Sequence, residues 1–360
     1  MKYWLAPLVL FSATSIYACS GTSTTPNNPS DSGTEEEDAT TDEDSGTPDA
    51  EDKDSYVDPG PKSCDPYELR KQALEVFIGP TGFEKLVVAK LKAAQSSIDI
   101  MIYQIGTTAI VNEIVAAHKR GVKVRVIQDR NQTKYGKPQL VAGGVDVKDS
   151  PAEFNHFHPK VLILDKKEAL IMSMNLTDFS TKGERNYGVV DKSAGDIEDL
   201  QKIFERDWTG SGDVDLSCTQ LVVSPQNAKT RLVDLIKKAK TQLDLSVMYI
   251  TEKDTFAAVL ERAKAGVAVR VLLANPAWIA NNADTAATLK AASIPVKYFT
   301  AYDLHAKLII SDGVAFIGSE NFSYNALTSN REVGVFASET TEIAKTRKQF
   351  EADFAGGVEP

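Results

Sequence analysis

The sequence is poor in the residue types that build metal centres and disulfide frameworks. Its 360 residues include only 3 Cys and 4 His, and no cluster of Cys, His and Asp has the spacing of metal ligands. The N-terminal apolar stretch, residues 3–18, is shorter than the roughly 20 residues that span a bilayer. With 42% hydrophobic and 25% charged residues, the composition excludes a collagen, a coiled coil and a wholly disordered chain. We therefore expect a globular protein that needs no cofactor.

The N-terminus combines an early cation, Lys2, with that apolar stretch and a cysteine. This pattern favours a secretory signal peptide, residues 1–19, over a transmembrane helix. Ile16-Tyr17-Ala18-Cys19 resembles a bacterial lipobox, although Tyr17 is bulky for that pattern. The resemblance implies secretion across the inner membrane and a lipid anchor on Cys19, at the outer membrane on its periplasmic or cell-surface side because Ser20 is not Asp. The alternative is ordinary signal cleavage that leaves Cys19 unmodified.

Residues 20–62 hold all of the chain's excess negative charge. They carry 13 Asp and Glu against two Lys, whereas residues 63–360 contain 37 acidic and 37 basic residues. The segment has almost no apolar residues and its like charges repel, so we expect a disordered acidic linker. The acidity of the whole chain, −10, therefore does not argue against a polyanionic substrate for the rest.

The remainder of the chain is an internal duplication with an offset of about 146 residues. It predicts a first lobe at 63–212 and a second lobe at 213–360. Apolar residues at helical spacing alternate with β-rich runs in both copies, which predicts two α/β/α lobes, each a mixed sheet flanked by helices. Cys64 and Cys218 begin the two copies, and we expect them to form a disulfide, with two buried thiols as the alternative. The matched pairs include 98–103 with 243–248, 121–126 with 266–271, 185–189 with 331–335, and 204–208 with 350–354.

Each copy carries the same set of polar residues. The first copy reads His158-x-Lys160-x-x-x-x-Asp165 followed by Ser173-x-Asn175. The second copy reads His305-x-Lys307-x-x-x-x-Asp312 followed by Ser319-x-Asn321. Residues i and i+2 of a strand share a face, so His and Lys of each copy should stand side by side and suit a phosphate. Two ordinary core histidines would not explain why Lys, Asp, Ser and Asn recur with them.

These two motifs resemble the signature of the phospholipase D superfamily, and the resemblance covers both lobes. It implies a pseudo-twofold axis, one active site shared by the lobes, and a metal-independent phosphodiesterase that works as a monomer. One His would attack phosphorus and form a phosphohistidine, and the other would protonate the leaving oxygen. By the usual family order His158 attacks and His305 is the acid. Lys160, Lys307, Asn175 and Asn321 would hold the phosphoryl oxygens, Ser173 and Ser319 would support them, and Asp165 and Asp312 would be structural.

The family pattern also places a carboxylate about ten residues after each motif Asn to orient a His. Glu332 occupies that place in the second copy, but Asn186 occupies it in the first. We therefore expect Glu332 to support His305 and to raise its pKa above that of His158. Glu184 is a substitute partner for His158, with a solvated loop residue as the favoured alternative.

Several further residues are candidates for the walls of the cleft. Tyr103 and Tyr249 end the first strands of the two copies, and a core position is the alternative for each. His156 is more simply a surface residue. The basic loop formed by Arg130, Lys134 and Lys137 could contact lipid head groups or nucleic acid, although such runs usually form a solvated face.

The substrate is left open between two classes of phosphodiester. An envelope lipoprotein lies close to lipid, which favours a phospholipase D that acts on a phospholipid head group at the membrane surface. The alternative is a nuclease that cleaves DNA or RNA. A phosphatidyltransferase and a catalytically dead binding module are less favoured, because His and Lys are intact in both copies.

Overall fold

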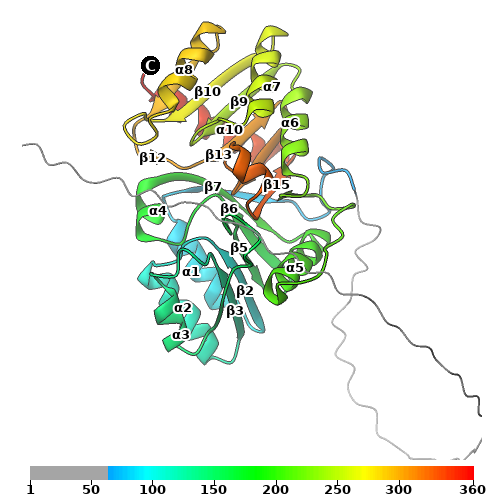
Figure 1. Ribbon diagram of the computed structural model, residues 1–360, viewed down its shortest axis with the longest axis vertical. Coiled ribbons are helices and arrows are strands. Elements are labelled where there is room, and N and C mark those ends of the chain that lie inside the picture. The colour runs from blue at the N-terminus through cyan, green and yellow to red at the C-terminus, as the bar shows by residue number, and fades with distance from the viewer. Residues whose placement is uncertain (1–63) are drawn as a thin grey trace, which may run out of the picture. The chain divides into compact units, whose positions relative to one another are not determined.

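The computed structural model describes residues 64–360. The expected signal peptide, the candidate lipid-anchor residue Cys19 and the expected acidic linker lie outside the described residues. Within 64–360, no helix is both long and apolar enough to cross a membrane. The described residues belong to one compact unit, in which Figure 1 shows two sheet-centred halves stacked along the long axis.

The first lobe is built on a mixed sheet with the strand order β1-β7-β6-β5-β2-β3-β4. Strands β2, β3 and β4 run parallel, and the other neighbours pair antiparallel. The strands are β1 (Glu75–Gly79), β2 (Ser97–Ile102), β3 (Lys123–Gln128), β4 (Asp146–Asp149), β5 (Lys160–Leu164), β6 (Glu168–Met172) and β7 (Glu184–Asp191). The helices are α1 (Phe83–Ala93), α2 (Thr108–Lys119), α3 (Lys137–Ala142), α4 (Asp178–Gly183) and α5 (Ala194–Thr209).

The second lobe repeats this order as β8-β15-β14-β13-β9-β10-β11, with β12 pairing instead with β7 of the first lobe. The strands are β8 (Leu221–Ser224), β9 (Gln242–Val247), β10 (Ala268–Ala274), β11 (Val296–Phe299), β12 (Asp303–Leu304), β13 (Lys307–Ser311), β14 (Val314–Gly318) and β15 (Glu332–Ala337). The helices are α6 (Ala228–Lys238), α7 (Lys253–Lys264), α8 (Asn282–Ala291), α9 (Tyr324–Thr328) and α10 (Thr340–Ala355). The shared strand order confirms the two α/β lobes expected from the duplication.

The central strands separate an outer core in each lobe from one core that both lobes share. Along β5, Leu162 and Leu164 pack with α1 and α2, whereas Val161 and Ile163 face the second lobe. This alternation follows from the period of two in a strand. The shared core also contains α5, α10 and residues of β13 and β14. Because apolar burial continues from one sheet to the other, the lobes form a single hydrophobic unit.

Backbone pairing crosses between the lobes next to each motif His. Leu304 in β12 pairs with Arg185 in β7, and Phe157 forms the equivalent parallel bridge with Arg331. The peptide N–H of His305 donates to the Arg185 carbonyl, and that of His158 donates to the Arg331 carbonyl. The residue before each motif His is therefore held against a strand of the opposite lobe.

The same two arginines form matched ion pairs across the lobe interface. Arg331 donates two hydrogen bonds of 2.9 Å to Asp207 at the end of α5. Arg185 contacts Asp353 in α10, at 2.8 Å from Nε and 3.1 Å from a terminal nitrogen. These four residues are equivalent positions of the duplication, so the repeat has preserved the bridges that join its copies.

The segment that precedes β1, residues 64–74, begins against the second lobe and continues into β1 of the first lobe. A disulfide joins Cys64 to Cys218, and Tyr67 stacks on Phe336 of the second lobe at 4.9 Å between ring centroids. Buried Arg70 pairs with Asp196 in α5 and donates to the Phe336 carbonyl. This segment therefore adds a third connection between the lobes.

Candidate active site

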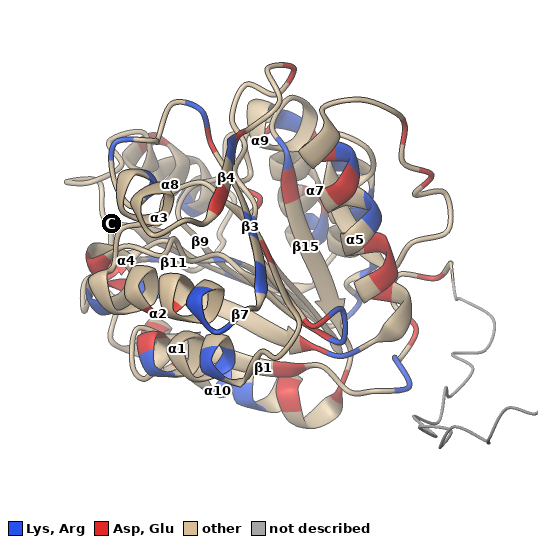
Figure 2. Ribbon diagram, turned by 90° about the horizontal axis from the view of Figure 1, so that it is seen from below, with Lys and Arg blue, Asp and Glu red and all other residues tan. Residues whose placement is uncertain are grey.

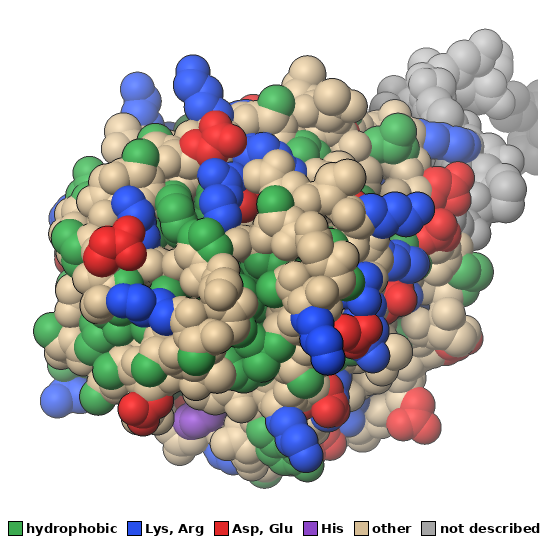
Figure 3. All heavy atoms as spheres, turned by 90° about the horizontal axis from the view of Figure 1, so that it is seen from above, with side chains coloured by type: hydrophobic (Ala, Val, Ile, Leu, Met, Phe, Trp, Pro, Cys, Tyr) green, Lys and Arg blue, Asp and Glu red, His purple; other side chains and the backbone are tan. Residues whose placement is uncertain are grey.

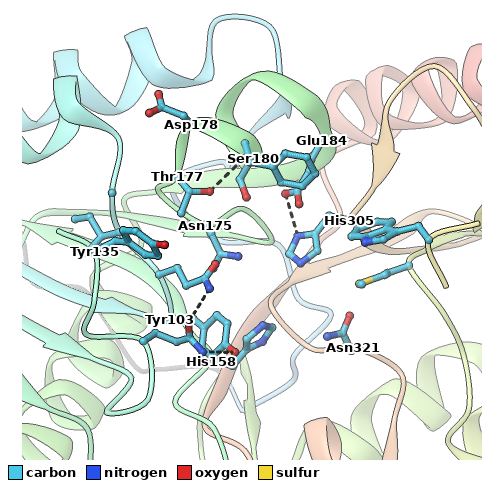
Figure 4. A pocket seen from close by; sticks show the side chains of 17 residues that line it. Tyr103, Tyr135, His158, Asn175, Thr177, Asp178, Ser180, Glu184, His305 and Asn321 are labelled. Carbon is cyan, nitrogen blue, oxygen red and sulfur yellow. Dashed lines mark hydrogen bonds and ion pairs between the residues drawn. The ribbon is translucent and has the colours of Figure 1, made fainter. Parts of the chain in front are cut away.

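Both motif histidines lie immediately before a central strand and line one cavity. The cavity has a volume of about 590 Å³ and lies between the lobes. His158 precedes β5 and His305 precedes β13, and both rings point into the same space in Figure 4. Asn175 and Asn321 lie beside this space. The other lining residues are Tyr103, Gln104, Ile105, Gly106, Gln132, Tyr135, Thr177, Asp178, Phe179, Ser180, Glu184, Met248 and Trp278.

The motif lysines lie in the wall behind the histidines. Lys160 and Lys307 are almost fully buried. Each Nζ donates to the carbonyl oxygen of the His two residues earlier, at 2.6 Å in both lobes. The Lys160 ammonium also lies 5.2 Å from the ring centroid of Tyr103. The two ammonium groups therefore lie against the backbone of the histidines, and burial lowers the pKa of both lysines.

The structure corrects the expected partner of Glu332. Its carboxylate contacts His158 of the other lobe, with 2.8 Å between Oε2 and Nδ1, and does not support His305. The cause is the parallel bridge between Phe157 and Arg331, which brings the residues that follow them into contact. The Glu332 carboxylate also accepts from Ser319 Oγ at 2.6 Å and from Asn330 at 3.1 Å.

His305 has the equivalent crosswise arrangement with an amide in the place of the carboxylate. Its Nδ1 lies 3.1 Å from Asn186 Oδ1, which accepts from Ser173 Oγ at 2.7 Å. Asn186 donates to Glu184 Oε2 at 3.1 Å, and that oxygen lies 3.5 Å from His305 Nδ1. Glu184 is buried, so neither the solvated loop residue nor the partner of His158 expected from the sequence is correct. It belongs to His305.

The remaining motif residues divide between the cavity and the scaffold. The buried amide oxygens of Asn175 and Asn321 have no hydrogen-bond partner in the described residues. Ser173 and Ser319 hold the groups that orient the histidines.

The two motif aspartates lie away from the cavity, each at the start of a neighbouring strand. Asp165 accepts from the backbone N–H groups of residues 95–97, where β2 begins. Asp312 does the same for residues 240–242, where β9 begins. Both aspartates have a positive φ, 54° and 47°, and both therefore fix a tight turn in the scaffold.

Burial controls the charges in this site. It lowers the pKa of His158 and His305 well below the usual value, and the nearby Lys160 and Lys307 charges lower both further. Burial also raises the pKa of Glu332 to about 8 and lowers that of Lys307 to about 7. Glu332 contacts His158 and not His305, so the expectation that Glu332 raises the pKa of His305 is wrong.

A second cavity next to the main cavity is smaller and has a more polar lining. A cavity of about 260 Å³ shares Tyr103, His158 and Asn321 with the main cavity. Tyr103 and Tyr249 both line it, as suggested for the cleft walls, and His156 also lines it although it is exposed, as expected for a surface residue. Ser323, Asn325, Ala326 and Asn330 complete the lining.

The basic loop does not present three free cations. Lys137 pairs with Asp149 at 2.6 Å, and Arg130 donates to the Pro151 carbonyl at 2.8 Å. Lys134 is exposed, with Nζ 5.6 Å from the ring centroid of Tyr135. Basic and acidic positions alternate along the ribbon of Figure 2, and the face drawn in Figure 3 shows basic and acidic side chains interspersed over the described residues, without a continuous basic track.

Sequence reasoning missed two aromatic walls of the cavity. Trp278 follows β10 and lies 6.4 Å from His305 between ring centroids, and Phe179 lies in α4. Neither belongs to a motif, and only tertiary structure brings them to the site. Residues 64–360 also bring no three His, Cys, Asp or Glu side chains together as a metal site.

Comparisons with known proteins agree with this architecture. The family described as "Cardiolipin synthase, PLD-like domain" matches the chain twice, at residues 87–208 and 232–354. The chain therefore belongs to the phospholipase D superfamily.

Individual relatives resemble parts or most of the chain. A phospholipase D of Rickettsia typhi is 30% identical over 115 residues, which are 30% of this chain and 54% of the relative. The chain thus spans about half the length of that curated relative. A cardiolipin synthase of Clostridium perfringens is 22% identical over 338 residues, 79% of this chain and 71% of the relative. The fold resembles that of a phosphatidylserine synthase of Haemophilus influenzae, with a TM-score of 0.63, 12% identity, and coverage of 80% and 87% of the two chains.

Proposed function

We propose that the protein is a phosphodiesterase that cleaves the head-group phosphodiester of a phospholipid through a phosphohistidine. One observation carries this proposal: His158 and His305, from opposite lobes, line one cavity, and each is held at Nδ1 by the other lobe. With Nδ1 engaged, Nε2 is the ring nitrogen assigned to the chemistry.

In the first step, His158 Nε2 attacks phosphorus. The bond between phosphorus and the head-group oxygen breaks, and the departing oxygen takes a proton from His305. The Lys160 and Lys307 charges and the amides of Asn175 and Asn321 stabilise the charge that develops on the phosphoryl oxygens. The bound anion also offsets the lysine charges that lower the pKa of His305, which favours its protonated form.

In the second step, water replaces the histidine on phosphorus. His305 takes a proton from the water, the water oxygen attacks phosphorus, and the bond to His158 breaks. An alcohol in place of water would give head-group exchange. The likeness to a cardiolipin synthase over 79% of the chain makes this transfer the second candidate function.

The unequal partners of the histidines support His158 as the nucleophile. Phosphorylation leaves a positive charge on the attacking imidazole, and the Glu332 carboxylate, 2.8 Å from its Nδ1, neutralises it. The acid must release its proton instead. His305 contacts an amide oxygen, with the carboxylate of Glu184 farther away at 3.5 Å.

The apolar walls of the main cavity favour a lipid over a nucleic acid. Ile105, Phe179, Met248 and Trp278 line it, whereas a single-stranded nucleic acid needs a basic groove. The phospholipase D and cardiolipin synthase relatives are consistent with this choice.

The test offers the purified full chain phosphatidylcholine, phosphatidylglycerol, cardiolipin, and single- and double-stranded DNA, with EDTA present and with or without glycerol. We expect head-group release that is absent in a His158→Asn/His305→Asn control. A new phospholipid in the presence of glycerol identifies transfer. Cleavage of DNA without cleavage of any lipid would contradict the proposal, and loss of all activity in EDTA would contradict the metal-independent mechanism.

A further inference from the structure

The described residues expose four aromatic side chains, of which two line the main cavity and two lie at or next to the hollows that adjoin it. Tyr135 and Phe179, 62% and 56% exposed, line the main cavity itself. Tyr302, 41% exposed, lines a hollow that shares Trp278 with that cavity. Tyr324, 65% exposed, lies between two residues that line the small polar cavity. We call Tyr135, Phe179, Tyr302 and Tyr324 the aromatic rim.

The rim is distinct from the other apolar surface of the protein. The remaining large hydrophobic side chains that the described residues expose are aliphatic: Leu69, Val141 and Val358. Exposed aromatic rings keep a large apolar area in contact with water. Their gathering around the main cavity and the hollows that adjoin it therefore indicates a surface that is covered during function.

The rim comes from both lobes and from four separate segments. Tyr135 precedes α3, Phe179 lies in α4, Tyr302 precedes β12, and Tyr324 begins α9. A folded protein bound to all four rings would cover the entrance to the cavity and block access of the substrate. A phospholipid surface could contact the same rings and still deliver substrate to the cavity.

Charge and side-chain type favour a lipid surface over a nucleic acid. Base stacking on aromatic rings is accompanied by a basic groove. The rim instead has charges of both signs beside it: Lys134 next to Tyr135, and next to Phe179 the Asp178 carboxylate, whose side chain is 58% exposed. Tyr residues are enriched where lipid head groups meet water, because the ring is apolar and the hydroxyl is polar.

We propose that the aromatic rim inserts into the head-group layer of a phospholipid surface and holds the cavity mouth against it. The inference rests on the proposed phospholipid activity and adds the way in which the enzyme reaches its substrate. Lys134 would meet a phosphate at the same level as the Tyr135 ring.

The first test measures insertion at single positions of the full chain. Tyr302→Trp and Tyr324→Trp are mixed with vesicles of brominated phosphatidylcholine and phosphatidylglycerol in equimolar amounts, and the signal of the unsubstituted chain is subtracted. We expect quenching at both positions and none in Leu69→Trp, the matched control away from the rim. Equal quenching of Leu69→Trp, no quenching at the rim, or fluorescence changes with single-stranded DNA but not with vesicles would overturn the proposal.

The second test separates docking from catalysis. Tyr302→Ser/Tyr324→Ser should hydrolyse vesicle phospholipid about tenfold more slowly, since apolar contacts with the surface are lost. Its rate on a short-chain phospholipid dissolved as monomers should stay unchanged. An equal fall on both substrates, or no fall on vesicles, would contradict rim docking. Absence of turnover by the unsubstituted chain would instead contradict the proposed function, and the quenching would still decide whether the rim docks.

Discussion

The two half-sites share their geometry and differ in their charge. In each, a Ser of one lobe holds a group that contacts Nδ1 of the other lobe's His. The group is the carboxylate of Glu332 at His158 and the amide of Asn186 at His305. The duplication has thus kept the crosswise scaffold while the two imidazoles have acquired different partners. A symmetric scaffold can in this way support one nucleophile and one acid.

The largest expected effect is loss of either histidine. His158→Asn should reduce turnover to background, because no other group can form the covalent intermediate. His305→Asn should reduce it by about 10²–10⁴-fold, the usual contribution of a general acid. The burst of leaving-group release on a substrate with a good leaving group separates the two roles, since such a leaving group needs no proton. His305→Asn should recover this burst, although its steady-state turnover stays slow because His305 also activates water, and His158→Asn should give no burst. Recovery by both variants, or by His158→Asn alone, would contradict the assigned roles.

The bridges that carry these half-sites should differ in stability. Arg331→Met removes the two-point partner of buried Asp207, which keeps only its contact with Arg206, and should cost about 3 kcal/mol of unfolding free energy, the low end for a broken buried pair. Arg185→Met should cost less, because Arg185 and Asp353 are more exposed, at 11% and 6% against 2% and 0%. Chemical denaturation measures both. A larger loss for Arg185→Met would show that burial does not rank the two bridges.

The carboxylates should contribute unequally to turnover. Glu332→Gln removes direct support of His158 and should lower kcat about 100-fold, as for other orienting carboxylates. Glu184→Gln acts on His305 mainly through Asn186 and should lower kcat about tenfold or less. The double variant Asn186→Asp/Glu184→Gln moves the carboxylate from position 184 to position 186, in direct contact with His305 Nδ1. Because a nearby negative charge stabilises the imidazolium, the pKa of His305 should rise. Equal losses for Glu332→Gln and Glu184→Gln would remove the proposed asymmetry.

The pH profile should report the Glu332–His158 pair. Burial raises the pKa of Glu332 to about 8, so below this pH the pair holds an extra proton on the carboxylate or the imidazole. A proton on the imidazole occupies His158 Nε2, which then cannot attack phosphorus. A proton on the carboxylate leaves Glu332 neutral, so that it no longer stabilises the charge on the attacking imidazole. We therefore expect kcat/KM to fall as pH decreases through about 8, and this limb to move in Glu332→Gln. An unchanged limb in that variant would assign it to another group.

The sequence predicted the lobes and most of the site because both depend on repeated local patterns. The His, Lys, Ser and Asn residues recur at nearly constant spacing, and the alternation of strands and helices follows from apolar periodicity. The crosswise contacts could not be predicted in this way. Equal repeats do not show whether Glu332 faces the His of its own copy or of the other. Burial of Glu184 and the approach of Trp278 also depend on the packing of one lobe against the other.

Identification of the phosphorylated residue tests the central claim most directly. The full chain is mixed with phospholipid labelled at phosphorus, quenched during turnover, and digested for peptide mapping. We expect acid-labile label on the peptide that contains His158, with greater accumulation in His305→Asn and none in His158→Asn. Label on the peptide that contains His305, retained in His158→Asn, would contradict the assignment of the carboxylate-supported histidine as the nucleophile.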